Sequence, residues 1–113
     1  MDTSAHIAGQ LAEWPSKNRM AEILREAGLQ LYVGSYSIRV DNCSHFVFQE
    51  YGGDLGSPSI DADAGSPEEM LHDGKLVSDA LAKAGVRHRF EIYDQKDGMV
   101  AYLNHDWPLE SLA

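Results

Sequence analysis

Two histidines near the end of the chain have the spacing of a paired site. The last two segments of alternating apolar residues flank Gln95-Lys96-Asp97-Gly98, a run typical of a hairpin turn. A four-residue turn sets His88 opposite His105 on the core-facing side. Two imidazoles, with Asp106 nearby, can contribute to a partial metal site or to a proton-sensitive pair. We therefore take His88 and His105 as candidate metal ligands, against the alternative that backbone groups or water satisfy both rings.

Asp61 and Asp63 precede Gly65 with the spacing that opens a calcium-binding loop. The motif is incomplete, because an EF-hand counted from Asp61 needs glycine at its sixth position and glutamate at its twelfth. The chain has Ser66 and His72 at those two positions. The sequence therefore favours an acidic loop that leads into a helix N-terminus, where acids are stabilised by the helix dipole.

Cys43 and His45 place a thiol near an imidazole, which is the pair that a cysteine nucleophile requires. We expect them in a hairpin turn, where no helix N-terminus lowers the thiol pKa, so a structural cysteine is favoured. Glycine-rich phosphate loops, paired zinc cysteines and a serine nucleophile elbow are absent from the sequence. The sequence predicts no catalytic residues and no cofactor.

The net charge of −9 is concentrated in one segment of the chain. Eight acids and no Lys or Arg lie between Arg39 and Lys75, whereas the rest of the chain carries ten acids and nine bases. Because a negative field repels phosphate, nucleic acid and anionic membranes are disfavoured as partners. A basic protein is the partner that this charge fits.

Two amphipathic helices are predicted, each ending at a glycine. The first covers about residues 16–27 and stops at Gly28, and the second covers about 66–84 and stops at Gly85. Ser66 is the expected cap of the second helix, followed by proline and glutamate as in a capping box. The first 15 residues are expected to form either an N-terminal extension or a short additional turn of helix.

Each predicted helix is followed by a predicted hairpin. Four segments alternate between apolar and polar residues, and they cover residues 29–40 with a bend at Gly34, 45–51, 86–92 and 99–103. The expected fold is a single α+β domain of 113 residues with the order α-β-β-α-β-β. In that fold a four-stranded antiparallel sheet carries both helices on one face. The units are 16–51 and 66–105, joined by an acidic loop at 52–65 and followed by a tail at 106–113.

The acidic loop is the predicted binding surface, because long irregular connections in compact domains tend to be functional. The candidate partner-binding residues are Asp54, Asp61, Asp63, Glu68 and Glu69. The leading hypothesis is a small non-enzymatic module that binds a basic protein, as an inhibitor, antitoxin-like or immunity-like protein does.

Two alternatives stay open. One is a small enzyme or metal-binding domain that uses His88, His105 and loop carboxylates. The other is a structural protein that associates with itself as a homodimer. The single cysteine and an N-terminus without a secretory signal pattern favour a cytoplasmic location.

Overall fold

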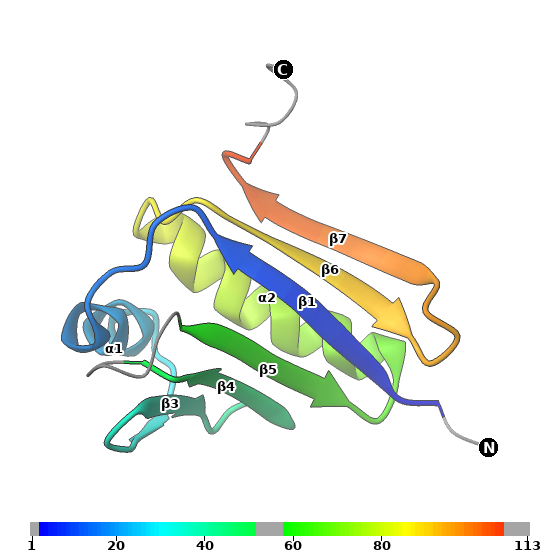
Figure 1. The fold of residues 1–113 in the computed structure, drawn as a ribbon, viewed down its shortest axis with the longest axis horizontal. Coiled ribbons are helices and arrows are strands. Elements are labelled where there is room, and N and C mark those ends of the chain that lie inside the picture. Colours follow the sequence, from blue (N-terminus) through cyan, green and yellow to red (C-terminus); the bar gives the residue numbers. More distant parts are fainter. Residues whose placement is uncertain (1–2, 52–57, 108–113) are drawn as a thin grey trace.

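The structure, a computed structural model, describes residues 3–51 and 58–107. Over these residues the chain forms two helices and one seven-stranded antiparallel sheet, with the strands in the order β2-β3-β4-β5-β1-β6-β7 (Figure 1). The strands are Ala5–Leu11 (β1), Leu31–Val33 (β2), Ser37–Val40 (β3), His45–Gln49 (β4), Ser59–Ala64 (β5), His88–Asp94 (β6) and Met99–His105 (β7). The helices are Lys17–Glu26 (α1) and Pro67–Lys83 (α2).

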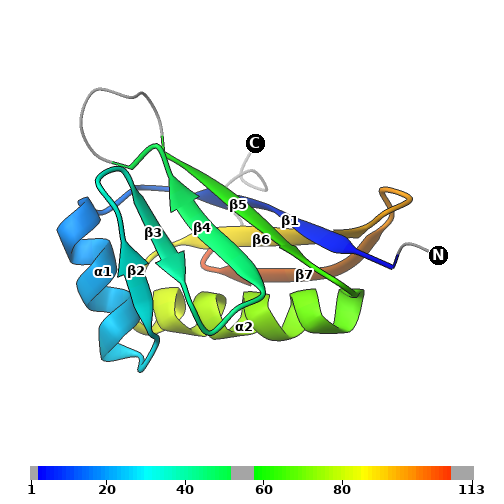
Figure 2. The same ribbon diagram turned by 90° about the horizontal axis from the view of Figure 1, so that it is seen from below.

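Both helices pack on one face of the sheet. Helix α2 lies along the sheet beneath β5, β1, β6 and β7, and α1 lies beside it next to β2 (Figure 2). The buried side chains of the helices, such as Leu24 and Met70, join one core with Phe46, Phe48 and Phe90 of the strands. The opposite face, here called the open face, carries no helix within residues 3–51 and 58–107. Among the described residues, neither helix is long and apolar enough to cross a membrane.

Strand β1 corrects the expected helical turn within the first 15 residues. It lies near the middle of the sheet and pairs with both β5 and β6. Ala5, Ile7 and Leu11 are buried, as the core-facing residues of a strand are. The alternation is interrupted at Gly9, where a Cβ atom would come within 2.9 Å of the Ile60 side chain and 3.1 Å of Phe90. Close packing therefore excludes the apolar residue that would have made this strand recognisable.

The expectation of a four-stranded sheet is wrong, because β5, like β1, is a strand that the sequence did not predict. The predicted acidic loop at 52–65 contains a strand from Ser59 to Ala64, with Ala62 and Ala64 buried and the alternating Asp61 and Asp63 exposed. The expected bend at Gly34 is a hairpin turn, because β2 and β3 pair antiparallel on either side of it. The α+β class remains, with most of the regular structure in the sheet.

The helix boundaries agree with the sequence. The Ser16 and Ser66 side chains each accept a hydrogen bond from the backbone N–H three residues later, at 3.1 Å in both cases. Gly28 and Gly85 follow the helix ends with φ of 88° and 77°. The prediction that both glycines adopt positive φ is confirmed.

Replacing Gly85 by alanine should lower the free energy of unfolding by about 1 kcal/mol, because a Cβ atom disfavours the left-handed conformation. Urea denaturation at constant pH measures the change. Gly65→Ala is the control, since a Cβ there meets only the Glu69 side chain at 3.6 Å and no positive φ is involved. A loss at Gly85 no greater than that at Gly65 would contradict this account of the helix end.

Candidate functional site

The predicted pairing of His88 with His105 is confirmed. The two residues are directly opposite each other in the β6–β7 pair. Their rings lie 6.3 Å apart, centroid to centroid, with an angle of 26° between the planes. His88 is fully buried and His105 is half-buried. The hairpin register therefore follows the local alternation of the sequence.

Both ring nitrogens of His88 are already used within the protein. Nδ1 donates to the carbonyl oxygen of Val86 at 2.8 Å, which assigns the neutral tautomer in which Nε2 accepts from the Ser78 hydroxyl at 2.7 Å. Burial lowers the pKa of His88 below its ordinary value of 6.5; the bond to Val86 opposes this shift, and the charge of His105 adds to it. A metal ion at His88 would have to displace one of these two hydrogen bonds.

Cys43 has the environment of a structural cysteine. The residue is 9% exposed, and its Sγ lies 3.8 Å from the backbone oxygen of Asp73. Burial, together with the nearby charge of Asp73, raises the pKa of the Cys43 thiol to about 12. The thiol is therefore protonated at neutral pH. A cysteine nucleophile reacts as the thiolate, so Cys43 does not meet that requirement. His45 reaches toward β5 and forms its side-chain hydrogen bond there.

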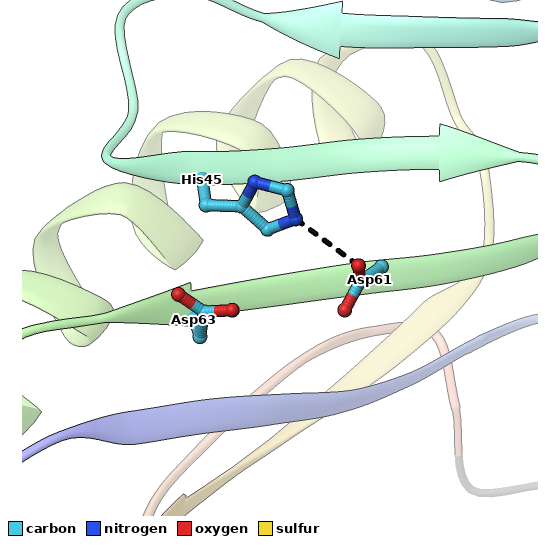
Figure 3. A group of neighbouring side chains, drawn as sticks. All are labelled: His45, Asp61 and Asp63. Atoms are coloured by element: carbon cyan, nitrogen blue, oxygen red, sulfur yellow. Dashed lines mark hydrogen bonds and ion pairs between the residues drawn. The ribbon is translucent and has the colours of Figure 1, made fainter.

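A second group of potential ligands lies on the open face. His45 on β4 is directly opposite Asp63 on β5. Its Nε2 donates to Asp61 Oδ2, two residues before Asp63, at 3.1 Å (Figure 3). One ligand atom from each of the three side chains lies within 4.8 Å of the other two. We call His45, Asp61 and Asp63 the open-face cluster.

The sequence could not bring the open-face cluster together, because its members meet only when β4 pairs with β5. The sequence predicts a loop for both aspartates and places His45 next to Cys43 only. The signal that was present is the alternation Asp-Ala-Asp-Ala at positions 61–64. That alternation has the period of a strand, in which alternate residues face one side.

The candidate partner-binding acids gather at one end of the sheet. Strand β5 ends where β1 begins, and its next residues lead into the first turn of α2, at the right of Figure 1. The β3–β4 and β6–β7 turns lie at the same end. The acids at this acidic end of the sheet are Asp41, Asp61, Asp63, Glu68, Glu69, Asp94 and Asp97. Asp54 lies outside the described residues.

The opposite end of the open face has a mixed character. Trp14 and Trp107 line a pocket of about 610 Å³ there, with Gln10, Glu13 and Arg87 among the other lining residues. Glu13 and Arg87 form an ion pair at 3.2 Å. Trp14 also packs edge-on against Phe48 and Tyr51. Trp14 therefore covers one edge of the core, and the two opposite charges neutralise each other.

Comparisons of the chain with protein-family models, curated proteins and solved structures found no significant match.

The free energy of unfolding should fall less at mildly acidic pH in the His88→Gln variant than in the wild-type protein. Because the pKa of His88 is lowered on folding, the unfolded chain binds this proton more readily, and stability falls as the pH drops below about 6.5. We expect the difference in unfolding free energy between wild type and variant to shrink from about pH 7.5 to 5.5. Denaturant titrations across this range measure the difference, with the exposed His72→Gln as control. A constant difference would contradict the lowered pKa.

Proposed function

We propose that the protein is a small non-enzymatic binding module that holds a basic partner protein at the acidic end of its sheet. The supporting observation is the convergence of seven acids at that end from two turns, strands β5 and β6, and the start of α2. Opposite charge on a partner raises the rate of encounter and selects among partners.

Few bases oppose this charge. Among the described residues, Arg39 pairs with Asp41 at 3.7 Å, and no Lys or Arg lies within ion-pair distance of Asp61, Asp63, Glu68 or Glu69. Lys96 lies in the β6–β7 turn at the acidic end, whereas several other bases lie on α1 and near the C-terminal end of α2, including Lys17, Arg19, Arg25, Lys83 and Arg87. The molecule is polarised, and a polarised charge distribution orients an approaching partner before contact.

The four central acids also have ordinary structural roles that a test must respect. Glu68 and Glu69 lie in the first turn of α2, where negative charge is favoured by about 0.3–1 kcal/mol per residue. Asp61 and Asp63 are exposed on the open face. Neutral amides at all four positions keep the size and polarity of the side chains, so the fold should survive with a modest loss of stability.

The variant Asp61→Asn, Asp63→Asn, Glu68→Gln, Glu69→Gln should bind a basic partner more slowly. The partner is first identified by capture from native lysate at low salt and release at high salt. The association rate of the purified pair is then measured, and at low salt we expect a decrease of about tenfold or more, which high salt abolishes.

The matched control removes the same number of negative charges elsewhere, at Glu13, Glu22, Glu26 and Glu50, all of which are exposed. This control should associate at nearly the wild-type rate. Equal rates for both variants would show that the position of the acids is irrelevant and would refute the proposed function.

Self-association is a second candidate function, favoured by the edge strand β7. This seven-residue strand contains no Lys, Arg, Asp, Glu or Pro, the residues that usually protect an exposed edge. Met99, Val100 and Tyr102 are 56%, 48% and 42% exposed. The opposite edge strand, β2, has only three residues and offers much less backbone for pairing.

If β7 pairs with a second copy, Val100→Lys should convert a dimer into a monomer, because charge on an edge strand opposes pairing. Sedimentation equilibrium measures the mass. Val33→Lys, on the opposite edge strand, is the control and should leave the dimer intact. A wild-type protein that stays monomeric at high concentration would eliminate this candidate.

A further inference from the structure

We propose that the open-face cluster is a divalent metal site, in which His45, Asp61 and Asp63 bind a transition-metal ion of the Zn²⁺ type. This inference goes beyond the binding of a protein partner and does not depend on it. It uses His45 in place of the predicted pair His88 and His105, and keeps two of the carboxylates that the sequence singled out.

The donor set fits zinc better than calcium or magnesium. Imidazole nitrogen and carboxylate oxygen are both common zinc ligands, and three protein ligands with a water molecule form a typical open zinc site. Calcium and magnesium prefer oxygen ligands throughout, and calcium takes six to eight of them. A site with one imidazole and two carboxylates therefore selects a borderline ion over a hard one.

Strand pairing fixes the positions from which the three ligands reach. His45 and Asp63 are directly opposite in the β4–β5 pair, where Cβ atoms lie about 4.5–5.5 Å apart. Asp61 and Asp63 are two residues apart on β5 and face the same side. Because all three Cα positions belong to the sheet, only side-chain torsions have to change when an ion binds.

The three ligand atoms would have to move only slightly closer together to bind a zinc ion. The three ligand atoms lie within 4.8 Å of one another, and two atoms that each bind zinc at about 2.0–2.1 Å lie at most about 4 Å apart. His45 Nε2 and Asp61 Oδ2 already lie 3.1 Å apart. The Asp61 side chain is 53% exposed and that of His45 35%, so both have room to rotate.

The negative charge of the two aspartates also favours the binding of a cation. Among the described residues the Asp61 carboxylate pairs with His45 alone, and the Asp63 carboxylate forms no hydrogen bond or ion pair. His6 faces Asp63 from the β1 side but stacks on Tyr93, with ring centroids 5.6 Å apart. Two carboxylates thus lie on neighbouring positions of one face beside a single imidazole, which contacts only one of them. A divalent ion would neutralise them, and water would complete its coordination on the side facing solvent.

Isothermal calorimetry of the full chain with Zn²⁺ at neutral pH tests the site. We expect one bound ion per chain. His45→Ala and Asp63→Asn should each weaken binding at least as much as the ~10-fold to 100-fold that loss of a supporting residue costs a metal site. The matched control is His72→Gln with Asp79→Asn, since both residues are exposed on α2, and it should bind as wild type does. Far-ultraviolet circular dichroism checks that each variant is folded.

A second measurement follows the ligand itself. Zn²⁺ should shift the ring ¹⁵N resonances of His45 in NMR spectra and leave those of His88 unchanged. Three results would overturn the proposal: His45→Ala binding Zn²⁺ as tightly as wild type, the His72 and Asp79 control weakening binding equally, or Ca²⁺ displacing Zn²⁺ at equal concentration. Partner association measured with a chelator present tests the acidic end alone, so failure of one proposal is distinguishable from failure of the other.

Discussion

The double pairing of β1 is the constraint on which the rest of the structure depends. The strand is bonded to β5 on one side and along its whole length to β6 on the other. It therefore joins the four strands β2 to β5 to the β6–β7 hairpin and makes one surface on which α2 can pack. It also aligns the end of β5 with the β6–β7 turn, so that acids far apart in the sequence share one end of the molecule. Without β1 the two halves of the sheet would have separate edges.

Local features of the fold were predictable from the sequence, and long-range pairing was not. Caps at Ser16 and Ser66, glycines after both helices and the register of His88 with His105 all depend on neighbours within one or two elements. Strand β1 was missed because Gly9 interrupts its apolar face. Strand β5 was missed because aspartate and alanine are uncommon in strands. The neighbours of both strands in the sheet come from distant parts of the chain, which periodicity cannot identify.

The candidate site shows the same division between local and distant information. His88 is easily paired from the sequence, yet its burial forces both nitrogens into hydrogen bonds, because an unsatisfied polar group in the core is unfavourable. His45 has no local partner of that kind and reaches another strand on the exposed side. The charge of Asp61 and Asp63 marks them as candidate binding residues whatever their conformation. The two aspartates face the same side, and can act as a pair of ligands, only because this segment is a strand.

The alternation along β5 also protects the pairing register of the strand. Its core-facing residues are Ile60, Ala62 and Ala64, and the two alanines bury too little apolar surface to contribute much to holding the register. A slip by one residue would turn Asp61 and Asp63 beneath α2, where an unpaired carboxylate loses several kcal/mol of hydration. The acids therefore exclude the wrong alignment, whatever they bind on the correct one. Apolar replacements at these two positions would remove this penalty and leave Ile60 as the main residue that distinguishes the two faces of β5.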